Sequence, residues 1–269
     1  MSKPASLVRW AVAALAVAVL LVPTARRPGL DGSAGRRRSP VTPVLVSTWA
    51  APRPRGVVLL LHGASRPGLA PASRWGASAL RMLPVAAATI CAGRGRVSVL
   101  RLVHGVRGWN SGASSAVADA RWALEQVRRC HPDVPVALVG HSMGARAALH
   151  VADDPSVTVV VGLAPWVTPT EPAGLLTGQR VVLLHGVSDR TTNPVATAAL
   201  VRRAQGVASA ATLVRFAGQG HTLLGHGDAA GRLTAQVAVT VLTRAGTPPR
   251  RAKPLLRSVL NGTDTVLGA

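Results

Sequence analysis

The sequence predicts an α/β fold: a three-layer α/β/α sandwich around a mostly parallel central sheet. Short apolar runs alternate with segments of helical composition along most of the chain. Most of the runs are apolar on both faces, as strands are when helices cover both sides of a parallel sheet. Glycine-rich and polar clusters mostly follow the runs. Ligands bind at the carboxyl ends of the strands in such sheets.

The predicted strands are short runs rich in valine and leucine. Pro43 lies in the first run and suits a strand at the edge of the sheet. The strands are expected at 41–47, 57–61, 97–103, 136–139, 157–161, 181–184 and 212–216.

The predicted helices lie between these strands. The clearest, at 114–129, repeats apolar side chains at helical spacing from Val117 to Val127. Pro132 and Pro135 separate this helix from the strand that follows. Four further helices are expected at 71–83, 145–150, 194–205 and 233–244.

Composition indicates one folded domain with a sizeable core. The chain has 269 residues, of which 48% are hydrophobic. We expect the α/β domain at 41–244. Residues 26–40 are rich in glycine, proline and arginine and are expected to form a linker. Residues 245–269 are expected to form a tail with prolines and arginines, either mobile or holding a short helix.

The N-terminus has the parts of an export signal. Lys3 and Arg9 precede an uncharged apolar run at 10–22, and a small residue follows the run. The run is short for a membrane-spanning helix, which needs about 20 apolar residues. We expect residues 1–25 to be an export signal or signal anchor, with membrane contact through 7–25. The protein is then exported or membrane-anchored. A buried N-terminal helix in a cytoplasmic protein is the alternative.

The charge is strongly positive, with 31 lysines and arginines against 10 acidic residues and a net charge of +21. A polyanion partner and a solvated surface of biased composition both explain this excess. The arginines are scattered and no nucleic-acid motif accompanies them, which favours the solvated surface. Aromatic residues make up only 3% of the chain, which argues against a stacking platform for nucleic acid. We expect no specific nucleic acid partner, and at most weak association with an anionic surface or polymer.

The two cysteines do not indicate a metal site. Neither Cys91 nor Cys130 belongs to a CxxC pair, and His131 has no second ligand at zinc-motif spacing. Two alternatives remain for these cysteines: a disulfide, if the chain is exported, or two buried free thiols.

The residues Gly-His-Ser-Met-Gly at 140–144 carry the strongest chemical signal. They lie between a predicted strand and a predicted helix. A serine in such a tight strand–turn–helix junction is held with its hydroxyl clear of the sheet. Ser142 is therefore the candidate nucleophile. A serine hydroxyl needs a base within hydrogen-bond reach, and the base needs an orienting acid.

The candidate acid is Asp189, which comes just after the strand at 181–184. Glu171, after the strand at 157–161, is the alternative. The candidate base is His221, in a glycine-rich loop after the last strand, from which an imidazole can reach over the serine. We expect His131, His150 and His226 to be surface or core residues.

The oxyanion of an acyl-transfer reaction needs two amide donors. We expect the backbone N–H of Met143, directly after the serine, and that of Ala64, in the loop after the strand at 57–61. Gly63 lets this loop approach closely. The expected pocket wall consists of His62, Ser65, Trp109 and Trp166. For the two tryptophans, core packing without substrate contact is an equal alternative.

Together these motifs resemble the α/β-hydrolase superfamily over about residues 43–244, in particular its small bacterial members. The motifs are Leu-Leu-Leu-His-Gly at 59–63, the pentapeptide at 140–144, the His-Gly-Val-Ser-Asp run at 185–189, and the Gly-His pair at 220–221. Only 162–180 intervene where many relatives carry a cap, so we expect no helical lid.

The resemblance implies Ser142 as nucleophile, His221 as base and Asp189 as acid, with an acyl-enzyme intermediate and no cofactor. A small acyl ester or thioester is the expected substrate. The alternatives are acyl transfer or peptide cleavage on the same fold, and a non-catalytic protein that binds a polyanion.

Overall fold

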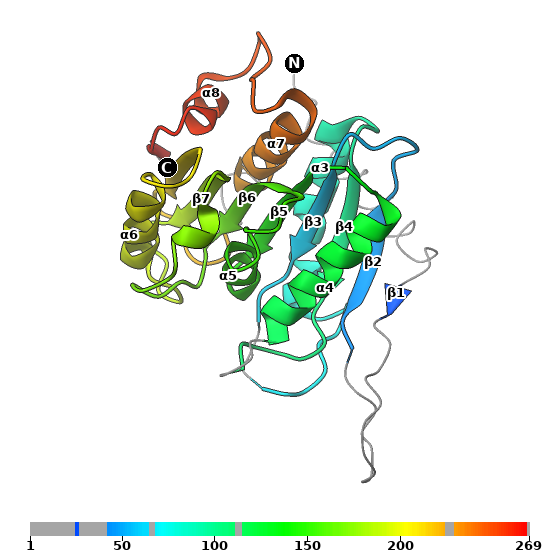
Figure 1. Cartoon of the computed structure of the whole chain (residues 1–269). Coiled ribbons are helices and arrows are strands. Elements are labelled where there is room, and N and C mark those ends of the chain that lie inside the picture. The colour runs from blue at the N-terminus through cyan, green and yellow to red at the C-terminus, as the bar shows by residue number, and fades with distance from the viewer. Residues whose placement is uncertain (1–24, 27–41, 65–67, 111–114, 224–228, 268–269) are drawn as a thin grey trace, which may run out of the picture.

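The computed structural model of the protein describes residues 25–26, 42–64, 68–110, 115–223 and 229–267. Within these residues the strands form one nine-stranded sheet, in the order β1-β2-β4-β3-β5-β6-β7-β8-β9 (Figure 1). Strand β2 pairs antiparallel with β1 and β4, and the other neighbours are parallel. The strands are β1 (Ala25–Arg26), β2 (Val44–Trp49), β3 (Val57–Leu61), β4 (Ser98–Val103), β5 (Val136–His141), β6 (Val157–Leu163), β7 (Arg180–Gly186), β8 (Ala210–Phe216) and β9 (Thr265–Leu267).

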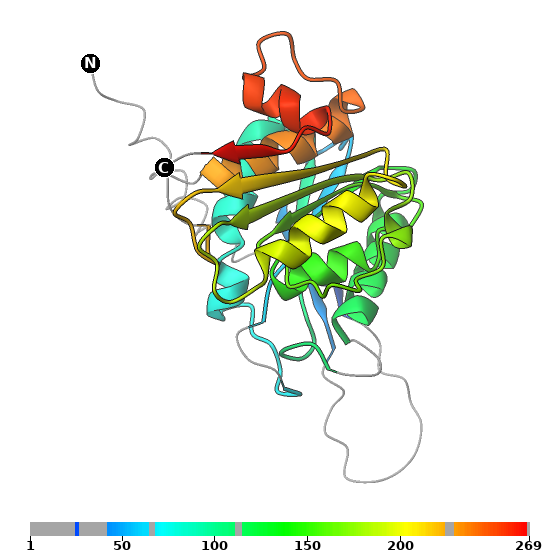
Figure 2. The same cartoon turned by 90° about the vertical axis from the view of Figure 1, so that its left-hand side faces the viewer.

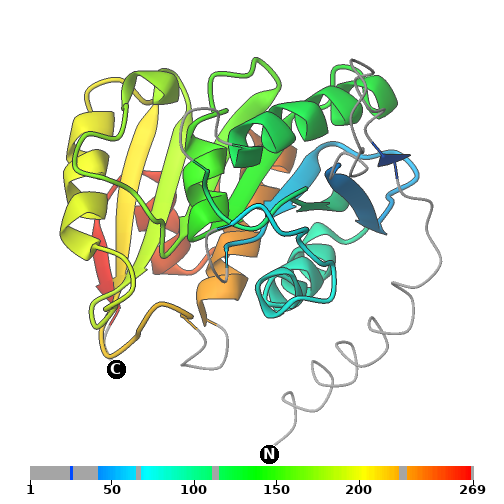
Figure 3. The ribbon, with the colours of Figure 1, turned by 90° about the horizontal axis from the view of Figure 1, so that it is seen from below.

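Helices cover both faces of the sheet (Figure 3). One face carries α4, α5 and α6, and the other carries α3, α7 and α8. The helices are α2 (Ala77–Leu80), α3 (Leu83–Gly93), α4 (Ser115–Cys130), α5 (Met143–Leu149), α6 (Pro194–Ala204), α7 (Ala229–Arg244) and α8 (Pro254–Leu260), with a short 3-10 turn η1 (Gly174–Leu176).

The core lies in two layers because the central strands bury both faces. In β3, Leu59 packs toward α4 and α5, whereas Leu60 packs toward α3 and α7. All five residues of β3 are buried. The α/β/α sandwich expected from the doubly apolar runs is confirmed.

The first helix after β3 differs from the expectation. A helix was expected at 71–83, but the structure forms only one turn there, α2, and then the longer α3 at Leu83–Gly93. Pro84 lies in the first turn of α3. Proline is tolerated there because its missing N–H would have no partner in a helix. The proline therefore marks the beginning of a helix and not an interruption.

The C-terminal segment also requires a correction. The domain was expected to end near Arg244, yet α8 and β9 both pack against it (Figure 2). Strand β9 pairs in parallel with β8, and Leu256, Val259 and Leu260 are buried against α7 and β8. The expected short helix is present, while the strand that follows it was not predicted. The folded unit thus extends to Leu267.

The segments expected to target the protein lie largely outside the described residues. Of residues 1–41, the structure describes only the two residues of β1, which extend the sheet beyond β2. The described helices include none long and apolar enough to cross a membrane. Cys91 and Cys130 are exposed free thiols, so neither the expected disulfide nor the expected burial is found.

Candidate active site

Ser142 occupies a strained turn between β5 and α5. Its backbone has φ 54° and ψ −116°, a conformation that non-glycine residues rarely adopt. Two glycines make the turn possible. A Cβ on Gly140 would overlap the backbone of Gly144, and a Cβ on Gly144 would overlap the carbonyl of Leu61 at the end of β3. The strain is maintained because neighbouring strands fix the turn, and Ser142 N–H donates to the carbonyl of Leu163 at 2.9 Å.

Asp189 lies in the loop after β7 and holds His221, from the loop after β8. His221 Nδ1 donates to Asp189 Oδ2 at 2.9 Å. The backbone N–H groups of Thr191 and Thr192 donate to Oδ1 at 2.7 and 3.1 Å, and the Thr192 hydroxyl donates to Oδ2 at 2.7 Å. Burial alone would raise the pKa of Asp189, but these hydrogen bonds outweigh it and lower the pKa to about 2. The carboxylate is therefore ionised at neutral pH.

His185 is a fourth partner of the same carboxylate, and the sequence did not suggest this role. Its Nε2 donates to Asp189 Oδ2 at 3.1 Å, and its Nδ1 accepts from the Thr197 hydroxyl at 2.9 Å. Burial lowers the pKa of His185, so the ring is neutral. Thr192 was also missed. Aspartate side chains in turns accept hydrogen bonds from backbone N–H groups shortly after them, so the run Asp-Arg-Thr-Thr at 189–192 carried a signal for this contact.

The loop that carries His221 is tied to the residue before the serine. His141 Nε2 donates to the carbonyl of His221 at 3.0 Å, and the two rings lie 4.9 Å apart. Burial lowers the pKa of His141 to about 4, so it is neutral and donates from one nitrogen only. Within the described part of the chain, no hydrogen bond joins the His221 ring to the Ser142 hydroxyl. Such bonds are often long in a free enzyme and shorten when substrate binds.

The loop after β3 lies directly against the serine. A Cβ added to Gly63 would lie 3.2 Å from the Ser142 Cβ, so only glycine fits without displacement. The backbone N–H groups of Ala64 and Met143 have no acceptor among the described residues. Met143 is the first residue of α5, where N–H groups lack helical partners. Two free donors thus flank the serine.

His62 fixes this loop from behind. Its Nδ1 donates to the carbonyl of Gly63 at 2.6 Å, and its Nε2 accepts from the backbone N–H of His104 at 3.2 Å. Burial lowers the pKa of His62 to about 3, which keeps the ring neutral. The ring lines a pocket with Ala64 and Arg107, and Ser142 is not among the residues that line it. Ser65 lies outside the described residues.

Trp109 and Trp166 lie together at the ends of β4 and β6, with ring centroids 6.1 Å apart. Trp166 is 38% exposed, and its backbone N–H donates to the carbonyl of Ser142 at 3.2 Å. Arg146 of α5 packs against both rings. Glu171, the alternative acid, bonds to Arg146 and not to His221. Among the described residues, Asp189 is therefore the carboxylate that binds His221.

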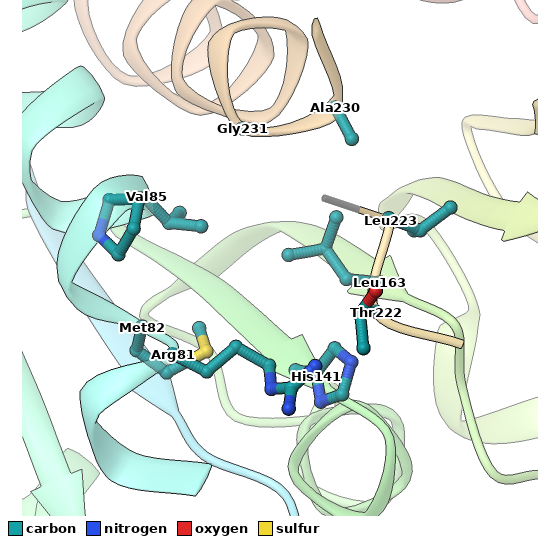
Figure 4. Close-up of a pocket in the computed structure, with 10 residues that line it drawn as sticks. Arg81, Met82, Val85, His141, Leu163, Thr222, Leu223, Ala230 and Gly231 are labelled. Carbon is teal, nitrogen blue, oxygen red and sulfur yellow. The ribbon is translucent and has the colours of Figure 1, made fainter. Parts of the chain in front are cut away.

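A small, mostly apolar pocket lies between the first turns of α3 and α7 (Figure 4). Arg81 and His141 form its polar side, and Nη1 of Arg81 is buried without a partner among the described residues. Ser142 is not part of its wall. In the described ranges, no cluster of histidine, cysteine and acidic residues could hold a metal ion.

Comparison with known proteins agrees with this architecture. The family model described as serine aminopeptidase, S33, matches residues 91–180. Comparison with curated sequences gave no significant match. Three solved structures are similar over most of the chain. An α/β serine hydrolase without a lid from Xanthomonas campestris is 20% identical and has a TM-score of 0.54, and the match covers 88% of this chain and 99% of that chain. An esterase from Thermogutta terrifontis is 17% identical and has a TM-score of 0.56, with coverage of 79% and 91%. An α/β serine hydrolase homologue from Coxiella burnetii is 16% identical and has a TM-score of 0.54, with coverage of 78% and 98%.

The chain has the α/β-hydrolase fold, as the resemblance seen in its motifs led us to expect, and the family match over residues 91–180 agrees with this fold. The family match and the neighbouring structures support a hydrolase. Between β6 and β7, where many relatives carry a cap, the structure forms only the 3-10 turn η1.

Proposed function

We propose that the protein is a serine hydrolase that cleaves a carboxylic ester or thioester. Ser142 is the nucleophile, His221 the base and Asp189 the orienting acid. The observation that carries the proposal is the 2.9 Å hydrogen bond between Asp189 and His221, in a loop tied to the residue next to the strained serine.

The arrangement suits acyl transfer to the serine. With Nδ1 of His221 held by Asp189, Nε2 is the nitrogen that accepts the proton as the Ser142 hydroxyl attacks the acyl carbon. The N–H groups of Ala64 and Met143 bind the oxyanion that forms on the carbonyl oxygen. His221 then returns the proton to the leaving alcohol or thiol. In the second half, His221 activates water, which releases the acid from Ser142.

The descriptions of similar structures favour an ester. The connection between β6 and β7 is short and forms no helical lid, so it does not limit the size of the substrate. Similar structures include proteins described as esterases. Peptide cleavage is the second candidate, since the matching family model is described as a serine aminopeptidase.

Labelling with a fluorophosphonate tests the nucleophile, and hydrolysis of short 4-nitrophenyl esters tests the reaction. Wild-type protein should be labelled and active, and Ser142→Ala should lose both properties. Ser209→Ala, an exposed serine far along the chain, is the matched control and should keep both. Ester hydrolysis that survives in Ser142→Ala would contradict the proposal. Absence of labelling in the wild type would favour a binding protein instead.

Amino acid 4-nitroanilides separate the two hydrolase candidates. An esterase should cleave the 4-nitrophenyl esters far faster than the anilides. A preference for the anilides would replace the ester proposal with a peptidase, and transfer of the acyl group to an added alcohol would indicate an acyltransferase.

A further inference from the structure

We propose that Arg146, packed against Trp109 and Trp166, binds a carboxylate that the substrate carries near its scissile bond. The inference rests on the proposed function, because it names the substrate class of that site. The preferred substrates are then esters or thioesters with a carboxylate on the acyl or the leaving group.

The two tryptophans hold the guanidinium of Arg146 in place. Its central carbon lies 4.3 Å from the Trp109 ring centroid and 5.0 Å from that of Trp166. The two rings are nearly perpendicular, at 88°, and therefore restrict the arginine from two directions. Cation–π contact with the two rings favours this position of the guanidinium. The arginine side chain therefore loses less conformational entropy when a ligand binds.

The polar contacts of Arg146 leave one edge of the guanidinium free. Its Nε donates to Glu171 Oε1 at 3.0 Å. Its two terminal nitrogens have no partner among the described residues, and neither is a buried orphan. The side chain is 14% exposed, so these nitrogens reach solvent. A fixed fork with two free donors matches the two oxygens of a carboxylate.

Glu171 orients Arg146 and does not take up its free edge. One of its oxygens binds Arg146 and His150, and the other accepts from the Thr168 N–H at 2.9 Å. Burial would raise the pKa of Glu171, but its hydrogen bonds lower the pKa to about 2. The guanidinium of Arg203 also contacts the Glu171 carbonyl at 2.9 Å. Arg146 thus contacts the Glu171 carboxylate, whereas Arg203 contacts only the backbone of the same residue.

The arginine is one helical turn from the nucleophile. Arg146 N–H donates to the Ser142 carbonyl at 3.1 Å, and the Trp166 N–H donates to the same oxygen at 3.2 Å. One turn of helix rises about 5.4 Å. Arg146 and Ser142 therefore lie on adjacent turns, and for this reason we place the substrate carboxylate near the scissile bond.

Two pairs of esters measure this preference. In the first, 4-acetoxybenzoate and its methyl ester differ by a carboxylate on the leaving group. In the second, 4-nitrophenyl hydrogen adipate and 4-nitrophenyl methyl adipate differ by a carboxylate on the acyl chain. In at least one pair, Arg146→Gln should lower kcat/KM for the charged ester about tenfold, as expected for loss of a charge-assisted fork. The neutral ester should change by less than about twofold.

Two further variants act as controls. Arg146→Lys keeps the charge without the fork and should recover only part of the preference. Arg203→Gln removes the other cation on Glu171 and should leave the charged-to-neutral ratio as in the wild type. A ratio that is the same in wild type and Arg146→Gln for both pairs would overturn the inference.

Binding without turnover separates this inference from the proposed function. In Ser142→Ala protein, 4-acetoxybenzoate should cause a saturable change in tryptophan fluorescence, and adding Arg146→Gln should abolish it. If wild type shows no Ser142-dependent hydrolysis, the proposed function fails while this titration still decides the carboxylate site. If hydrolysis depends on Ser142 but neither the titration nor the ester ratios depend on Arg146, the function stands and the carboxylate site is refuted.

Discussion

His185 and His221 donate hydrogen bonds to the same oxygen of Asp189, at 3.1 and 2.9 Å. The two rings differ in burial: the side chain of His185 is 1% exposed and that of His221 is 19% exposed. His185 therefore fixes the carboxylate on its buried side, and His221 contacts the same oxygen from the candidate site. The position of the acid is fixed before any substrate arrives.

Asp189→Asn tests which acid serves the base. The amide keeps the shape but lacks the charge and favours the wrong histidine tautomer, so kcat should fall by about 10³-fold or more. Steady-state kinetics on a short ester measures the loss. Glu171→Gln, which changes the alternative acid, should retain most activity on neutral esters. The reverse ranking of the two variants would show that Glu171 is the acid.

Gly144→Ala tests the geometry of the turn. A Cβ there overlaps the Leu61 carbonyl, so β3 and α5 must separate. We expect loss of activity and a destabilisation of about 2 kcal/mol or more, as for other overpacked sites. Urea denaturation and ester hydrolysis report the two effects. Gly174→Ala is the control, because a Cβ there meets nothing within 4 Å. If both variants behaved alike, close packing at the turn would not be the cause.

Stability should fall as the solution is acidified below about pH 6.5. Burial holds the pKa of His62 at about 3 and of His141 at about 4, below the ordinary value of 6.5. Between pH 6.5 and these lowered pKa values, the unfolded chain binds more protons than the folded one. The free energy of unfolding therefore decreases as the pH falls through this range. Each such histidine contributes a slope of up to about 1.4 kcal/mol per pH unit.

Urea denaturation at pH 6.5, 5.5 and 4.5 measures this slope. Replacing His141 with glutamine should reduce it, because one group with a lowered pKa is gone. His131→Gln, at a half-buried bend after α4, is the matched control for replacement of a histidine. A free energy of unfolding that stays constant over this range would show that the buried rings are protonated in the folded state.

Leu260→Ala tests whether the C-terminal segment belongs to the folded unit. The side chain is buried with α7 and β8 in the core, so the substitution should cost about 2–4 kcal/mol of unfolding free energy. Val266→Ala, in the exposed part of β9, should change stability by less than about 0.5 kcal/mol. Equal and small effects would mean that α8 is detached in solution.

The sequence predicted most of the sheet because its strands are buried on both faces. Every residue in runs such as 57–61 and 181–184 is apolar and buried. These strands could therefore be predicted without knowing which segments pack against them. The candidate residues were found for the same reason. Each follows a strand, and parallel strands bring their carboxyl ends to one edge.

The features that the sequence did not predict depend on contacts between distant segments. Strand β9 has three residues, of which Val266 is exposed, and it is a strand only because β8 offers it a free edge. The contacts of Arg146 depend on two tryptophans from other loops. His185 lies only four residues before Asp189, but their contact depends on a turn that spacing alone does not predict.

The position of β9 also has a consequence for biosynthesis. A chain emerges from the ribosome N-terminus first, so the segments that carry Ser142, Asp189 and His221 are available to fold before the last strand. Until residues 265–267 are released, the backbone of β8 remains an open edge, and such edges pair readily with other chains. Folding of the segments that carry Ser142, Asp189 and His221 and protection of the edge of β8 against aggregation are therefore separate events, and β9 determines the second.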